Sequence, residues 1–240
     1  GLQHQDGTSQ LIASTIPNCR AYDPCYAYEL ALILEEGMRT MLAEQRDTFY
    51  YVTVMNENYA HPSIPEHVRE GVLRGVYRIR STTAAKVRLL GAGTILRETL
   101  AAAELLQNDF GIDAEVYSVT SVTELRRDAM HCERAARVGA SRKPAWIEQQ
   151  LPADGTPIVG ASDYVAAVPD LIRPWVADRY VTLGTDGFGR SDTRAALREF
   201  FEVDRRSIAL AALHTVDSTL AQDAALSWNI DPTSPPPWRR

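Results

Sequence analysis

The strongest constraint on the fold is an alternation of short apolar runs with amphipathic stretches through the second half of the sequence. The apolar runs predict strands at 86–90, 115–119, 158–161 and 180–183. The stretches that follow them show the apolar spacing of helices, at 95–108, 124–137, 145–151, 165–176 and 192–201. This alternation predicts an α/β fold with a mainly parallel sheet flanked by helices.

The first quarter of the chain carries a smaller pattern of the same kind. Residues 18–22 and 49–55 predict strands, and the apolar spacing between them predicts a helix at 26–43. Two strands and one crossover helix cannot close a core, because a parallel sheet needs both faces covered and its edges managed. We therefore expect that the chain is a fragment or that a partner chain completes this unit.

A proline-containing stretch separates the two patterns. Pro62 and Pro65 exclude a continuous helix over 58–66 and predict a linker there. The last part, 206–230, is expected to be mostly helical, and the prolines after it favour a mobile tail. We assign the end of one domain, a linker, a second domain and a proline-rich tail to 1–57, 58–84, 85–231 and 232–240.

Composition and charge narrow the class of protein. The chain is 45% hydrophobic and 23% charged, which is typical of a globular fold and argues against disordered, collagen-like and disulfide-scaffold classes. A formal net charge of -6 without a basic stripe argues against a general nucleic-acid binder. No apolar run approaches the roughly 18 residues of a membrane span, and the first residues are not signal-like. We therefore expect a cytoplasmic protein.

The three cysteines also favour a cytoplasmic location. Cys19, Cys25 and Cys132 form no C-x-x-C pair and are odd in number, which fits a reducing compartment better than a disulfide framework. Without paired Cys and His spacing, we expect no structural zinc site, and we assign no metal ligand in the chain.

The polar start of the chain is the first candidate site. His4 lies in a glycine-flanked stretch with Gln3, Asp6 and Gln10, where no hydrophobic pattern explains the side chains. Functional residues often lie on such loops. An exposed chain end has the same composition, and the residues alone favour that interpretation.

Three other segments allow a structural and a functional interpretation. Gly91-Ala92-Gly93 follows a strand and opens a helix, but Leu96 replaces the third glycine of a dinucleotide fingerprint, so a tight turn is favoured. The glycine-rich segment 183–194 is suited to an anion or to a rigid turn, with Ser191 or Asp192 as the N-cap of the next helix. Residues 56–58 end a strand, where ligands of open α/β sheets bind.

Several blocks of the sequence together resemble one family. In chain order they read GLQHQDG, AYDPCYAYELA, YYVTVMNENY, GVLRGVYR, VYSVTSVTELRRDA and LGTDGFGRSDTRAALREFFEVD. Over roughly residues 1–204 they are similar to the C-terminal portion of the homodimeric-type pyruvate dehydrogenase component, a thiamine-diphosphate-dependent enzyme of the transketolase-like superfamily.

The resemblance implies a division of labour within a three-domain enzyme. This chain would hold the last strand-helix-strand part of a pyrimidine-binding domain and a C-terminal transketolase-like domain with a mainly parallel, mixed sheet. The GDG motif with a downstream Asn, which binds the diphosphate and Mg²⁺ in the family, is absent. Most ligands of thiamine diphosphate and Mg²⁺ would therefore lie outside this chain, as would the glutamate that activates the cofactor.

The resemblance also implies a reaction and partners. The family decarboxylates pyruvate on its cofactor and passes the two-carbon unit to a lipoyl group of dihydrolipoyl acetyltransferase, a step that leads to acetyl-CoA. His4 matches the family histidine on the substrate side, and Gln3, Asp6 and Gln10 are its loop neighbours. We expect a homodimer that needs the missing N-terminal domains or a complementary subunit, and an isolated chain that is inactive.

Departures from the family pattern leave the substrate open. The block 132–140 lacks the family's usual Trp-Asn and His-Pro pairs, and the C-terminal helical segment is shortened and irregular after Leu213. Thr8 replaces a second histidine of the first block, and Ala129 replaces a glycine after Arg127-Asp128. A split thiamine-diphosphate-dependent 2-oxoacid decarboxylase or carboligase subunit is one alternative. A non-catalytic interaction module is another.

Overall fold

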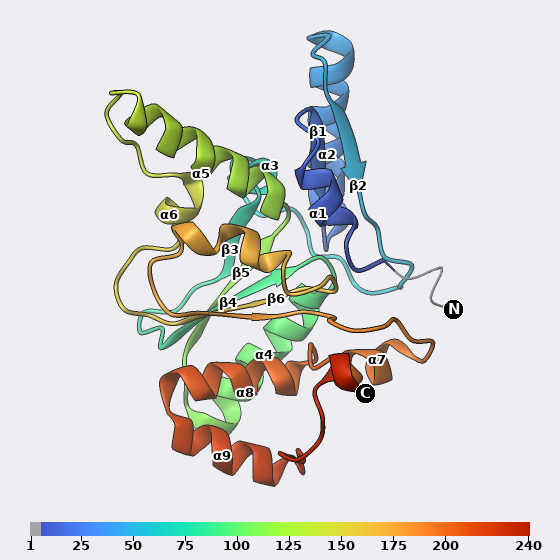
Figure 1. The fold of residues 1–240 in the computed structure, drawn as a ribbon, viewed down its shortest axis with the longest axis vertical. Coiled ribbons are helices and arrows are strands. Elements are labelled where there is room, and N and C mark those ends of the chain that lie inside the picture. Colours follow the sequence, from blue (N-terminus) through green and yellow to red (C-terminus); the bar gives the residue numbers. More distant parts are fainter. Residues whose placement is uncertain (1–5) are drawn as a thin grey trace.

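The computed structural model describes residues 6–240 and contains two sheets (Figure 1). The smaller sheet pairs β1 (Cys19–Tyr22) with β2 (Phe49–Val52) in parallel. The larger sheet has five strands in the order β3-β5-β4-β6-β7. The mixed α/β fold expected from the sequence is confirmed.

The smaller sheet belongs to an N-terminal unit that also contains α1 (Ser9–Ser14) and α2 (Ala27–Met38). The helix expected at 26–43 is α2 followed by one π-helical turn, η2 (Arg39–Ala43). The expected loop at the start of the chain is shorter than predicted, because α1 begins within it at Ser9.

Four strands of the larger sheet are parallel and one is antiparallel. β4 (Val87–Ala92), β5 (Ala114–Val119), β6 (Ile158–Ala161) and β7 (Tyr180–Leu183) run in one direction. β3 (Val76–Arg80) pairs antiparallel with β5. It follows α3 (Arg69–Arg74), so the range expected as a linker contains a helix and an edge strand of the sheet.

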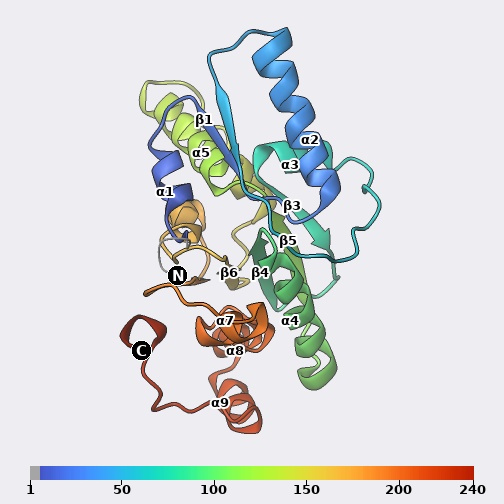
Figure 2. The same cartoon turned by 90° about the vertical axis from the view of Figure 1, so that its right-hand side faces the viewer.

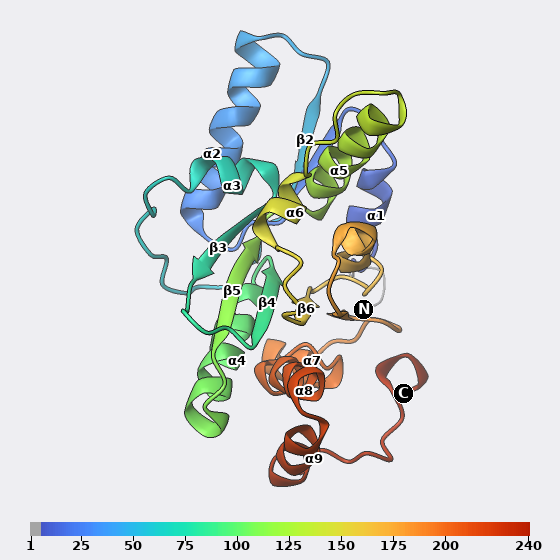
Figure 3. The ribbon, with the colours of Figure 1, turned by 90° about the vertical axis from the view of Figure 1, so that its left-hand side faces the viewer.

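Helices cover both faces of this sheet (Figures 1 and 3). One face packs against α4 (Ile95–Phe110) and α8 (Arg205–Val216), and the other against α5 (Val122–Arg137) and α6 (Trp146–Gln150). Because side chains alternate along a strand, Leu89 joins the first core and its neighbour Leu90 the second. Burying each leucine contributes about 1.5–3 kcal/mol.

The N-terminal unit is tied to the larger sheet by a buried carboxylate. Glu29 on α2 accepts N–H bonds from Cys25 (2.6 Å) and Tyr26 (2.8 Å) at the start of its own helix. Its other oxygen accepts hydroxyl bonds from Tyr77 on β3 and Ser118 on β5, both 2.6 Å long. Four donors thus satisfy a carboxylate that has no exposed surface.

The prediction of an α-helix at 165–176 is wrong. That segment forms only a 3₁₀ helix, η3 (Pro169–Trp175). Pro169 and Pro174 lack the N–H groups that an α-helix needs, and proline clashes with the preceding turn.

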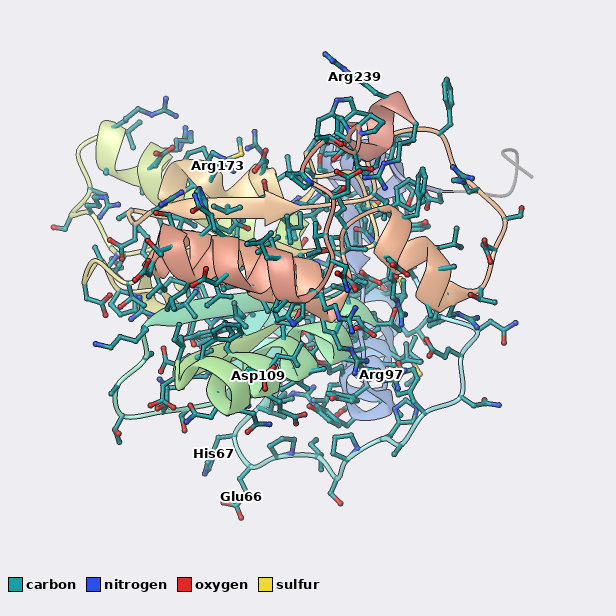
Figure 4. The ribbon with its side chains drawn as sticks, turned by 90° about the horizontal axis from the view of Figure 1, so that it is seen from below. Glu66, His67, Arg97, Asp109, Arg173 and Arg239 are labelled. Carbon is teal, nitrogen blue, oxygen red and sulfur yellow. The ribbon has the colours of Figure 1, made fainter. Side chains whose placement is uncertain are left out.

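The C-terminal part packs back on the domain. After α7 (Arg194–Phe200), α8 and α9 (Ser218–Ser227), the chain ends in a 3₁₀ turn, η4 (Pro237–Arg239). The structure differs here from the expected mobile tail, because Pro237 is buried and Arg240 forms an ion pair of 2.9 Å with Glu202. Arg239 points outward from this segment (Figure 4).

Candidate functional site

The carboxyl ends of four strands meet where the N-terminal unit contacts the larger sheet (Figures 1 and 2). Asp23 and Thr53 directly follow β1 and β2. Gly93 directly follows β4, and Asp163 lies two residues beyond β6. Ligands of parallel sheets bind beyond the carboxyl ends of the strands, which makes this junction the candidate site.

Asp23 makes three hydrogen bonds at the junction. Its backbone N–H donates to the Thr120 carbonyl (2.8 Å), and its carbonyl accepts from the Gly93 N–H (3.1 Å). Its carboxyl accepts from the Thr53 hydroxyl at 2.7 Å. Although the residue keeps some exposed surface, neighbouring atoms enclose the carboxyl.

A second acid, Asp163, lies near Asp23. The Thr94 hydroxyl donates to its carboxyl (3.3 Å), and the Thr185 hydroxyl donates to its backbone carbonyl (2.8 Å). Burial raises the pKa of Asp163. Burial and repulsion from Asp163 together raise the pKa of Asp23 to about 7, against a smaller lowering by Thr53. Asp23 can therefore gain or lose a proton near neutral pH.

Of the four site residues predicted from the sequence, the structure describes two, Asp6 and Gln10. Gln3 and His4 lie outside the described residues. Asp6 accepts N–H bonds from Thr8 (3.1 Å) and Ser9 (2.8 Å) and a bond from the Ser9 hydroxyl, so it holds the turn into α1. Tyr51 on β2 donates to the Ser9 hydroxyl at 2.9 Å and ties this turn to the smaller sheet.

Gln10 is on α1 and is 5% exposed. Its Nε2 has no hydrogen-bond partner in the described structure. A small cavity of about 10 Å³, lined by Gln10 together with Asp23, Ser162 and Tyr164, lies beside it. Gln10 and Asp23 therefore line the same cavity, whereas Asp6 is exposed in the turn before α1.

The N-terminal turn also contacts the larger domain directly. The Val165 N–H donates to the Gly7 carbonyl at 3.0 Å. The strand-end loop after β6 therefore supports the segment that follows His4. This contact joins residues far apart in the sequence, and the pattern of the sequence carried no signal for it.

The Gly91–Gly93 turn serves packing. A Cβ at Gly91 would lie 2.6 Å from both the Leu96 Cα and the Thr99 hydroxyl oxygen, which no real side chain tolerates. Gly93 has φ +51°, and a Cβ there would collide with the Asp23 carboxyl. The tight-turn interpretation agrees with this geometry, and Asp23 occupies the place beside the turn.

Residues 56–58, which were expected to end a strand, lie beyond β2, because that strand already ends at Val52. Glu57 forms ion pairs with Arg97 on α4 (2.8 Å) and Arg198 on α7 (3.2 Å). These arginines lower the pKa of Glu57 against the opposing effect of its burial. The Glu57 carboxylate therefore links the segment after β2 to α4 and α7 through these two ion pairs.

The segment 183–194 links β7 to α7 and contacts the loop after β6. The Thr185 N–H donates to the Tyr164 carbonyl (2.9 Å), and Asp186 accepts from the Ala166 N–H (3.3 Å). The N-cap prediction was wrong by one or two residues. Thr193 caps α7, with its hydroxyl accepting from the Ala196 N–H at 3.3 Å.

Residues 75–204 match the family model described as the transketolase-like C-terminal domain, and residues 1–62 match the pyruvate dehydrogenase E1 component middle domain. The chain belongs to the transketolase-like C-terminal domain family. The pyruvate dehydrogenase E1 component of Pseudomonas aeruginosa is 50% identical over 244 residues, which cover 97% of this chain and 28% of that protein. The E1 component of Escherichia coli K12 is 44% identical over 243 residues, covering 96% and 27%.

This transketolase-like chain is homologous to the C-terminal part of pyruvate dehydrogenase E1 components, which establishes the family recognised from the sequence blocks. It spans just over a quarter of the length of those relatives. Among solved structures, a transketolase mutant from Pichia stipitis superposes with a TM-score of 0.64 at 20% identity, covering 90% of this chain and 28% of the other. That likeness concerns the fold.

The family depends on thiamine diphosphate. Within residues 6–240, no group of three His, Cys, Asp or Glu side chains could hold a metal ion. Those residues do not fit a Mg²⁺-diphosphate centre by themselves. The described helices also include none that is long and apolar enough to cross a membrane.

Sequence reasoning missed Asp23 and Asp163. Each follows a strand within two residues, so a search for acids at strand ends would have found both. It could not have shown that the two strands belong to different sheets whose ends converge.

Proposed function

We propose that this chain is the C-terminal part of a cytoplasmic, thiamine-diphosphate-dependent and Mg²⁺-dependent pyruvate dehydrogenase component. The proposed reaction is decarboxylation of pyruvate and acetylation of lipoyl groups on dihydrolipoyl acetyltransferase. The observation that carries the proposal is identity of 40–50% over nearly the whole chain to proteins named pyruvate dehydrogenase E1 component.

The residues of this chain would supply one wall of the active site. His4 would face the substrate and exchange a proton or hold its carboxylate. Asp6 and Gln10 would position the loop that carries His4, which is consistent with the Asp6 turn and the burial of Gln10. Bound thiamine diphosphate would supply the electron sink, and most of its ligands would come from outside the chain.

An apolar surface on the N-terminal unit supports the need for further protein. Leu34, Met38 and Leu42 on α2 and η2 are 50%, 56% and 71% exposed, and Phe49 on β2 is 43% exposed. Apolar surface of this kind marks an interface, and a two-stranded sheet is only marginally stable alone. The missing part of the middle domain would cover it, in a homodimer.

Reconstitution tests the proposal. The chain would be assayed with pyruvate, thiamine diphosphate, Mg²⁺ and ferricyanide, alone and joined to the upstream domains of a relative. We expect turnover only in the joined protein, and a loss of about 100-fold or more in the His4→Ala variant of it. His131→Ala, an exposed change on α5, should leave the rate unchanged. Turnover by the isolated chain would refute the proposal that the active site needs residues from outside this chain.

Thr8 favours a second candidate. It lies at the start of α1 beside Asp6, in a position where the family resemblance has a histidine. A split 2-oxoacid decarboxylase or carboligase would use the same wall with another acceptor. Product analysis with several 2-oxoacids distinguishes the two reactions. An unchanged rate in the joined His4→Ala protein would instead support a non-catalytic interaction module.

A further inference from the structure

A separate cavity lies beneath the edge strand β7, away from the junction. α8 contacts β4 and β6, and the half-buried side chains of Val181 and Leu183 on β7 remain beside it. The space is bounded by α8, α9 and the segment 228–240, which returns towards α7 (Figure 1). The cavity is partly open to solvent and has a volume of about 730 Å³. Small-molecule sites have volumes of about 300–1,000 Å³.

The floor of this cavity is apolar. Val181 and Leu183 line it from the sheet, Leu210 from α8, and Trp228 and Ile230 from the end of α9 and beyond. These apolar side chains are suited to an aliphatic body, which gains about 0.8 kcal/mol for each CH₂ group removed from water.

The rim of the cavity carries an excess of acid. Four carboxylates line it, against two guanidinium groups, those of Arg206 and Arg240. Arg240 is already paired with Glu202. The other three carboxylates belong to Glu199, Asp204 and Asp231. Asp204 caps α8 by accepting from the Ser207 N–H (2.9 Å), and Asp231 accepts from the N–H and hydroxyl of Thr233 (2.8 and 2.7 Å). His214, on α8, also lines the cavity.

We propose that this cavity binds a small organic monocation with an apolar body, such as an alkyl amine. The body would lie against the floor between β7 and α9. The ammonium group would lie at the rim, where exposed Glu199 can pair with it while it remains hydrated. This site is independent of pyruvate chemistry and of residues 1–10.

Matched ligands test the charge preference. Octylammonium, octanol and octanoate share one body and differ in charge. Binding to the full chain would be measured by calorimetry and by the shift of the Trp228 indole N–H resonance. We expect octylammonium to bind about tenfold more tightly than octanoate, with octanol between them. Equal or tighter binding of octanoate, or no binding of any of the three, overturns the proposal.

Two variants test the location. Ala225→Leu, which fills the cavity, should weaken octylammonium binding by about tenfold or more. Ala135→Leu, at a half-buried alanine on α5, is its control and should bind normally. Glu199→Gln keeps the fold because it is exposed, and should weaken the amine by about two- to fivefold without affecting octanol. Normal amine binding in both Ala225→Leu and Glu199→Gln would overturn the assignment.

Discussion

The hydroxyl of Tyr77 donates a hydrogen bond of 2.6 Å to the buried carboxylate of Glu29, which joins an edge strand of the larger sheet to the helix of the N-terminal unit. Tyr28 extends this contact, because its hydroxyl lies within hydrogen-bond distance of the Tyr77 hydroxyl, at 2.5 Å. The N-terminal unit, whose sheet has only the two strands β1 and β2, is thus stabilised by hydrogen bonds to the domain that contains the larger sheet.

Glu29→Gln should destabilise the chain. An amide presents two donors where four donors now point at a carboxylate, so buried N–H or hydroxyl groups lose their acceptor. We expect the free energy of unfolding to fall by about 2–4 kcal/mol, measured with urea. The control on the same helix is Glu35→Gln, which breaks only an exposed pair with Arg69 and should cost less than about 1 kcal/mol. Equal losses in the two variants would contradict the role of Glu29.

Gly93→Ala tests the close approach of Asp23. Gly93 and Gly111 both have positive φ, at +51° and +64°, but only Gly93 has an acid where the Cβ would lie. Gly111→Ala should cost about 1–2 kcal/mol for the backbone alone. Gly93→Ala should cost at least about 1 kcal/mol more, since a steric clash is added. Thermal unfolding of both variants measures the difference, and similar melting temperatures would argue against the contact.

The buried Asp23 should make stability depend on pH in an unusual direction. Its folded pKa, about 7, is above the ordinary value of 3.8, so the folded state holds the proton more tightly than the unfolded chain. This contribution is fully present below about pH 4 and is lost as the pH rises to 7, with a slope of at most about 1.4 kcal/mol per unit. Asp23→Asn should remove that slope in urea unfolding between pH 4 and 7. If the free energy of unfolding of the variant keeps the same pH dependence, another titrating group is responsible for it.

Gln10→Leu separates stability from positioning. The amide nitrogen of Gln10 is buried without a partner in the described structure, so an apolar replacement of similar size should leave stability unchanged or raise it by about 1 kcal/mol. In the protein joined to upstream domains, the same change should lower kcat if Gln10 positions the loop. Gln149→Leu, on α6, is the control for the substitution itself. Unaltered kcat would leave Gln10 with no part in catalysis.

Local sequence was sufficient for the elements whose side chains are buried in the larger sheet. The strands at 158–161 and 180–183 were predicted with the observed bounds, because apolar runs between turn residues have few other ways to be buried. The same reasoning failed at 165–176, where apolar spacing suggested a helix although Pro169 and Pro174 remove the hydrogen bonds that would sustain one.

The sequence by itself determined the order of strands and helices and, through its ordered blocks, the family. Only the tertiary structure decided which side chains share a site. Asp23 and Asp163 are separated by well over a hundred residues. Burial where the two sheets converge raises the pKa of both, and repulsion from Asp163 adds to the rise at Asp23. Periodicity reports which face of an element is buried, whereas the meeting of strand ends depends on how the two units pack, through contacts such as Glu29 with Tyr77 and Gly7 with Val165.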